Sequence, residues 1–129
     1  HKLDDYLTKL RARVSLSDVE YLADSDQQDI VERNLQLAIQ TCIDVANYII
    51  AYEGPRSADK LENVFAVLGE ADIIPMDLAS RMVGMVRFRN ILVHNYLDID
   101  SSLVYEHLTH RLDDFEAFAR AILKFVEKE

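Results

Sequence analysis

The stretch from residue 26 to residue 52 constrains the fold more than any other, because its apolar residues recur at alternating spacings of four and three. That spacing places them along one side of an α-helix. Further apolar residues broaden the stripe, so this helix must be buried on more than one side. We therefore expect it inside a helical bundle, or inside a bundle that also dimerises. The stripe consists of Val31, Leu35, Ala38, Cys42, Val45, Ile49 and Tyr52, broadened by Ile39, Ile43, Ala46 and Ile50.

The rest of the chain repeats the helical period, and no segment alternates as a strand would. Capping motifs at Ser17 and Ser25 predict the start of a short helical turn ending at Leu22 and of the long helix. The sequence thus predicts an all-α fold, an antiparallel four-helix bundle with an additional N-terminal helix, in one domain over residues 1–129. The other helices are expected over 2–13, 58–69, 75–95 and 102–127, the last with Val104, Leu108, Phe115, Ile122 and Val126 facing inward.

Net charge and cysteine content limit the classes of function. The formal net charge is −9, which argues against broad electrostatic attraction to nucleic acid. No apolar run is long enough to span a membrane, and no signal peptide is recognisable. Cys42 is the only cysteine, so it cannot form an internal disulfide, which fits a reducing compartment. We expect a cytoplasmic protein that does not associate with membranes.

One charged residue interrupts the apolar stripe of the helix expected over 75–95. Arg89 takes a position that the helical spacing assigns to the core, among Leu78, Met82, Met85 and Leu92. A charge that is buried or lies in an interface needs a partner or a function. Residues 81–96 also contain no acidic side chain, so they form a cationic island in an acidic chain. Its cations are Arg81, Arg87, Arg89 and His94.

The string from Arg89 to Tyr96 brings Arg, Asn, His and Tyr together within eight residues. Arg is always charged and holds phosphate through two parallel hydrogen bonds, and His transfers protons near neutral pH. The set suits phosphoryl chemistry that needs no metal. On an ideal helix, Arg89 and His94 point about 140° apart, so they do not share a face. A long reach by Arg89, a kinked helix or a second subunit could bring both groups to one phosphate.

The order Arg-Asn-x-x-Val-His-x-Tyr near the end of the third long helix resembles the HEPN superfamily, in particular its HepT branch of toxins. The resemblance covers nearly the whole chain and also rests on residues 29–36, 44–47, 85–90 and 112–115. It implies a metal-independent endoribonuclease toxin of a type VII-like toxin–antitoxin pair, with no cofactor, which cuts RNA through attack by the 2′-OH. His94 would be the general acid or base, Arg89 would stabilise charge on the phosphorane oxygens, and Asn90 would orient His94 or the phosphate.

The resemblance also implies partners and a form of control. Such toxins form two-fold dimers whose motifs line one cleft, so we expect a homodimer or a larger assembly of dimers. Their partner is a nucleotidyltransferase antitoxin, abbreviated MNT, which attaches AMP to the tyrosine of the His-x-Tyr ending, here Tyr96. Asp44 and Asn47 would support the site from the preceding long helix, as polar residues do in many HEPN proteins. The alternative for these two residues is a solvated strip.

Two other functions remain open from the sequence. One is a non-catalytic helical partner or substrate-binding subunit of a nucleotidyltransferase, although the intact Arg, Asn, His and Tyr favour the enzyme. The other is a metal-binding bundle, because His107 and His110 lie near Asp113 and Asp114 at helical spacing. Di-metal four-helix bundles use Glu-x-x-His pairs, and this chain has none. We therefore predict no metal site.

Overall fold

The computed structural model describes residues 2–53, 63–94 and 99–128, and within these ranges the chain forms seven α-helices and no strand. The prediction of an all-α fold is confirmed. Expected helices over 2–13, 26–52 and 75–95 are present with small shifts at their ends. The helices are α1 (Lys2–Arg11), α2 (Asp18–Leu22), α3 (Ser25–Glu53), α4 (Val64–Glu70), α5 (Met76–His94), α6 (Ser101–His110) and α7 (Leu112–Glu127).

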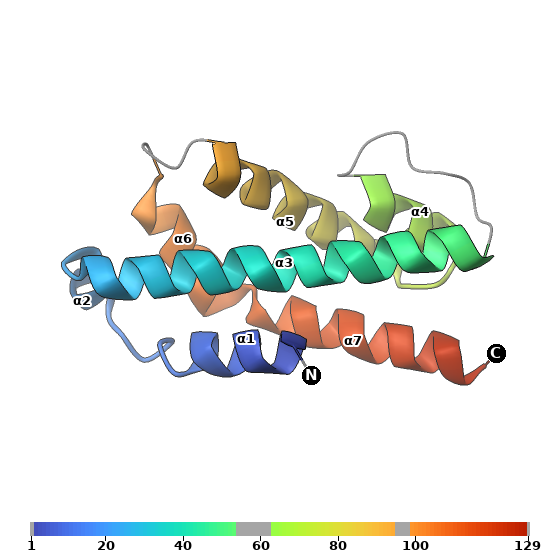
Figure 1. Cartoon of the computed structure of the whole chain (residues 1–129), viewed down its shortest axis with the longest axis horizontal. Helices are drawn as coiled ribbons and strands as arrows, with labels where there is room; N and C mark the ends of the chain where they lie inside the picture. The colour runs from blue at the N-terminus through green and yellow to red at the C-terminus, as the bar shows by residue number, and fades with distance from the viewer. Residues whose placement is uncertain (1, 54–62, 95–98, 129) are drawn as a thin grey trace.

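Helix α3 is the centre of the bundle and contacts each of the other helices (Figure 1). Helix α5 runs antiparallel to α3 and appears above it in Figure 1, whereas α1 and α7 appear below it. Helices α5 and α7 also contact each other. The long segments α1, α3, α5 and α6–α7 alternate in direction, as short connections in a helical bundle favour. Helix α4 packs against both α3 and α5. Among the described residues, no helix has the length and apolar character that a membrane crossing requires.

The apolar stripe of α3 is buried as predicted over most of its length, from Val31 to Ile49. Tyr52 is an exception, because 72% of its surface is exposed and its ring stacks on Tyr48 at a centroid distance of 4.7 Å. A repeat of four and three drifts by about 20° per heptad around a straight helix. Three heptads separate Val31 from Tyr52, so the stripe has rotated out of the core by its end. Cys42 is buried, and burial raises the pKa of its thiol to about 12, which makes it unreactive.

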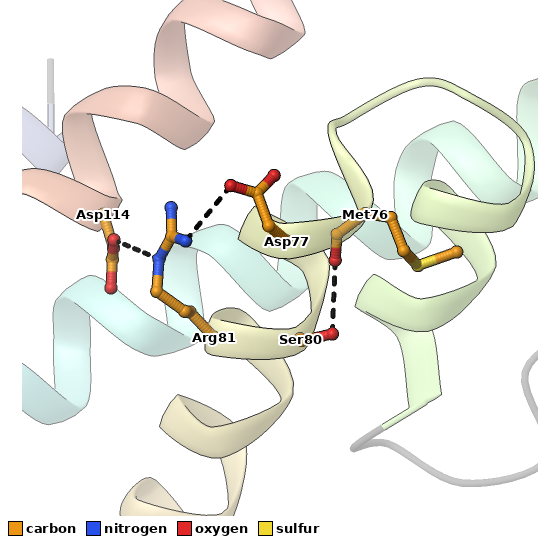
Figure 2. Close-up of polar contacts among 5 residues, drawn as sticks. All are labelled: Met76, Asp77, Ser80, Arg81 and Asp114. Atoms are coloured by element: carbon orange, nitrogen blue, oxygen red, sulfur yellow. Dashed lines mark hydrogen bonds and ion pairs between the residues drawn. The ribbon is translucent and has the colours of Figure 1, made fainter.

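The last helix was expected to be continuous over 102–127, and this prediction is wrong. The backbone departs from regular helix geometry at Arg111 (φ −118°, ψ −2°), where α6 ends and α7 begins. No glycine or proline marks the break. Ion pairs from other helices instead hold the first turns of α7. Arg81 of α5 binds Asp114 at 2.9 Å (Figure 2), and Arg11 of α1 binds Glu116 at 2.7 Å.

The inward face of this region is also shorter than predicted. Val104, Leu108 and Phe115 are buried and Ile122 packs partly buried against the core, whereas Val126 is 56% exposed. Ser17 forms the predicted capping box with Glu20. The cap of α3 is provided by Asp24, whose carboxylate accepts from the backbone N–H groups of Asp26 and Gln27. The predicted helix start at residue 58 lies outside the described residues, and the described helix α4 begins at Val64.

Candidate active site

Arg89 lies between α5 and α3 and is held by two amide oxygens. Its Nη2 donates a 2.7 Å hydrogen bond to Oε1 of Gln40, and its Nη1 donates a 3.2 Å hydrogen bond to Oδ1 of Asn90. The stripe that predicted a core position for residue 89 explains the burial, because Met85 and Leu92 on the same side of α5 are both buried. The guanidinium is partly buried, and its Nε is fully buried without a hydrogen bond to a described residue.

Arg89 makes no ion pair with any acidic side chain in the described part of the chain. Its partners are neutral, so they orient the guanidinium without cancelling its charge. A partly buried cation without a counter-ion carries a desolvation cost, and that cost falls when an anion binds. A guanidinium in this arrangement can bind an anion such as a phosphate group.

Asp44 reaches Arg89 only through Gln40. The side-chain amide nitrogen of Gln40 donates a 2.8 Å hydrogen bond to Oδ1 of Asp44, one helical turn further along α3. Because a carboxylate only accepts and a guanidinium only donates, this pair of neighbours fixes which end of the Gln40 amide faces Arg89. Asp44 therefore belongs to the network as the residue that orients Gln40.

Gln40 was not predicted as a site residue from the sequence. The sequence did indicate a possible contact between Gln40 and Asp44, because side chains four residues apart on one side of a helix can form a hydrogen bond. Asn47 continues the same polar strip, but it is exposed and makes no hydrogen bond through its side chain with a described residue. The structure thus joins Asp44 to Arg89 and leaves Asn47 apart.

His94 is the last residue of α5, and its side chain is exposed. Helix α5 remains α-helical from Met76 to His94, so Arg89 and His94 leave its axis about 140° apart. Arg89 and Asn90 are hydrogen-bonded in the network with Gln40. His94 makes no hydrogen bond to a described residue, although Asn90, four residues before it, lies on the same face of α5. Tyr96 lies outside the described residues.

The two histidines of α6 have separate environments. His107 stacks on Phe88 of α5, with ring centroids 3.7 Å apart and planes 8° from parallel, and its Nδ1 lies 3.1 Å from the carbonyl oxygen of Leu103. Burial lowers the pKa of His107 below its usual value. His110 is exposed. Within the described ranges, no three His, Cys, Asp or Glu side chains form a group suited to a metal ion.

Comparison with known proteins gives matches over most of the chain. The family described as "Ribonuclease HepT-like" matches residues 3–122. An "mRNA nuclease HepT" of Shewanella oneidensis is 32% identical over 103 residues, which cover 80% of this chain and 77% of that protein. A "tRNA nuclease HepT" of Aphanizomenon flos-aquae is 32% identical over 122 residues, 94% of this chain and 82% of that protein.

A solved structure has the same fold. It is the tri-AMPylated HEPN toxin of Shewanella oneidensis in complex with an MNT antitoxin, with a TM-score of 0.84 and 26% sequence identity. The superposition covers 99% of this chain and 92% of the toxin chain. The bundle described above is therefore the fold of a toxin that has been observed with its antitoxin.

Proposed function

Because the chain belongs to the HepT-like ribonuclease family, we propose that it is a metal-independent endoribonuclease toxin of a type VII-like toxin–antitoxin pair. The site is assigned from Arg89. Its guanidinium is partly buried, is held by two neutral amide oxygens and has no counter-ion among the described residues. Such a guanidinium is ready to bind an RNA phosphate. The relatives that share about a third of the sequence are named as nucleases of mRNA and of tRNA.

In the proposed reaction, the ribose 2′-OH attacks the adjacent phosphorus and the bond from phosphorus to the 5′-oxygen breaks. A histidine takes the proton of the 2′-OH, and a second acid gives a proton to the leaving 5′-oxygen. The products are a 2′,3′-cyclic phosphate and a 5′-OH. His94 is the proton-transfer group of this chain, and each such transfer is worth about 10²–10⁴-fold in rate. Arg89 stabilises the charge that develops on the phosphorane oxygens.

A two-fold dimer provides the second proton-transfer group from the other chain. It also allows Arg89 and His94 to reach one phosphate although they point apart on α5. His94 and Arg89 of one chain point about 140° apart, so one phosphate meets both groups more readily when they come from different chains. We propose a homodimer, or a larger assembly of dimers, in which the two motifs line one cleft. Asn90 and Asp44 then position Arg89, directly and through Gln40.

Control by a partner enzyme is the final part of the proposed function. The toxin with the same fold carries AMP and is bound to an MNT antitoxin. We propose that a nucleotidyltransferase antitoxin attaches AMP to Tyr96 of this chain, in the His-x-Tyr ending of the motif. The anionic phosphodiester would then compete with the RNA phosphate for Arg89.

The test is RNA cleavage by purified wild-type protein and by Arg89→Ala and His94→Ala, with and without EDTA. We expect each variant to lose at least about 10²-fold in rate and wild-type cleavage to persist in EDTA. Matched controls are Arg120→Ala and His110→Ala, which remove exposed groups of the same kinds elsewhere. Folded variants that cleave like the wild type would assign the chain to a non-catalytic subunit instead, and loss of cleavage in EDTA would contradict the metal-independent mechanism.

A further inference from the structure

A hollow lies where α5 meets the junction of α6 and α7, and neither Arg89 nor Gln40 lines it. Its volume is about 250 Å³. That volume is ample for a phosphate group with several waters, since a water occupies about 30 Å³ in the liquid. The hollow is lined by Ser80, Arg81, Gly84 and Met85 of α5 and by His107 and Arg111.

The two arginines of this hollow differ in how their charges are balanced. Arg81 donates to Asp114 at 2.9 Å and to Asp77 at 3.4 Å, so its charge is already paired (Figure 2). Arg111 is exposed and forms no ion pair with a described carboxylate. The hollow therefore presents one guanidinium without a counter-ion, on a chain whose net charge is −9.

Gly84 provides a second, independent observation. It lies in the interior of α5, where glycine is the least favourable residue except proline. A Cβ added at this position would meet no atom of the described residues within 4 Å, so the packing of this chain does not require a glycine. A bare backbone with an open space beside it allows a ligand to approach the helix closely.

Gly84, at the edge of the hollow, lies about 80° around α5 from His94, whereas Met85 lines the hollow from the side of Arg89. Gly84, Arg87, Ile91 and His94 follow one another at spacings of three, four and three, so they share one face of the helix. Arg87, Ile91 and His94 are exposed. At a rise of 1.5 Å per residue, about 15 Å along the axis separates Gly84 from His94. A strand of RNA lying along this face would reach the hollow a few nucleotides from the bond that His94 acts on.

We propose that the hollow at Gly84 and Arg111 binds an RNA phosphate a few nucleotides away from the scissile phosphate. The inference rests on the proposed function and adds to it a second anchor for the substrate. Arg111 supplies the hydrogen-bonding fork for the phosphate, and Gly84 leaves room for the sugar–phosphate backbone. Phosphate contacts of this kind position a strand without reading its sequence.

The experiment measures binding of a fluorescent, fully 2′-O-methylated oligonucleotide of mixed sequence, which cannot be cut because it has no free 2′-OH. Arg111→Ala should weaken binding about three- to tenfold and lower the salt slope by about 0.7, the value for one phosphate contact on a single strand. Gly84→Gln fills the hollow with a good helix former and should weaken binding while the Tm stays equal or rises. Arg120→Ala, an exposed arginine of α7 outside the hollow, is the matched control and should bind like the wild type.

Cleavage of unmodified bulk RNA provides the second measurement. Arg111→Ala should raise KM with little change in kcat, because it removes binding that is equal in the ground state and the transition state. If Arg111→Ala and Arg120→Ala bind and cleave alike while the wild type is active, this inference is wrong and the proposed function stands. If Arg111→Ala alters only the affinity for the antitoxin, the hollow is a protein interface and the inference is also wrong. A wild type that neither binds nor cleaves RNA would instead overturn the proposed function.

Discussion

Gln40 of α3 accepts a 2.7 Å hydrogen bond from Nη2 of Arg89 on α5, across 49 positions of the sequence. The contact orients the guanidinium through a neutral group. Asp44 hydrogen-bonds to Gln40 and not to the guanidinium itself. A carboxylate at position 40 would form an ion pair with Arg89 and stabilise its buried position, but it would also compete with the phosphate. A neutral amide at position 40 therefore leaves the charge of Arg89 available to a phosphate.

Gln40→Glu tests this interpretation, because it replaces the side-chain amide with a carboxylate of nearly the same size. We expect kcat for RNA cleavage to fall at least about tenfold, because the new carboxylate neutralises Arg89. The Tm reports two opposing effects, the new ion pair with Arg89 and the loss of the hydrogen bond to Asp44, which would then face a second carboxylate. Gln27→Glu is the matched control, since Gln27 accepts a 2.9 Å hydrogen bond from Arg13 far from the motif. Unchanged kcat in Gln40→Glu, measured together with its melting curve, would show that the charge of Arg89 is not used.

Mixing two inactive variants tests whether the site is shared between subunits. In a dimer of Arg89→Ala with His94→Ala, one composite site loses both groups and the other keeps both. If Arg89 and His94 act from different chains, the mixed dimer should cleave RNA faster than either variant alone, but at less than half of the wild-type rate, because it keeps only one of the two His94 side chains. The measurement is cleavage after co-refolding, with each variant refolded alone as the control. Lack of recovery in a verified mixed dimer would place both groups in one chain.

Tyr96→Phe tests the control by the antitoxin. The variant lacks the acceptor oxygen but keeps the ring, so it should cleave RNA and escape silencing by the partner nucleotidyltransferase with ATP. Intact mass should show a gain of one AMP, or a small integer number, on the wild type only, and peptide mapping should place it on Tyr96. Tyr105→Phe is the control, because Tyr105 donates a 2.6 Å hydrogen bond to Leu16 inside the fold. Silencing of Tyr96→Phe by an active partner would contradict the proposal.

Two glycines should respond to alanine in opposite directions. A Cβ at Gly69 would lie 2.7 Å from Cβ of Ala79, so Gly69→Ala forces α4 away from α5. Such overpacking costs about 1–3 kcal/mol, more than the helix propensity gained near the end of α4. Gly84→Ala meets open space and should stabilise the protein by up to about 1 kcal/mol. Chemical denaturation of both variants measures the difference, and equal effects would contradict the close packing at Gly69.

Acid should destabilise the protein through His107. Burial lowers its pKa in the folded state, so the unfolded state binds more protons as the pH falls below 6.5, the usual value. Stability should therefore fall with pH in this window, and His107→Phe should reduce that fall while keeping a ring against Phe88. Glu32 has a raised pKa and contributes a slope of the opposite sign, so the comparison of variant with wild type isolates His107. Urea unfolding at several pH values measures the slopes, and exposed His110→Gln should leave the wild-type slope unchanged.

The helical class, the burial of most of the α3 stripe and the unusual charge at position 89 could all be predicted from the order of residues alone. These features depend on spacing within one helix, and a period of 3.6 residues can be read from the order of residues alone. The resemblance to HEPN toxins was also carried by a short string with fixed spacing, from Arg89 to Tyr96.

Which side chains contact one another depends on the packing of the helices. The hydrogen bond between Gln40 and Arg89, the break at Arg111 and the open space beside Gly84 all depend on how helices distant in sequence lie against one another. The period of a helix gives the direction of each side chain around its own axis, but it contains no information on the rotation and register of the neighbouring helix. For this reason the sequence identified Arg89 as a candidate, and only the packing of α3 against α5 showed that neutral partners hold it.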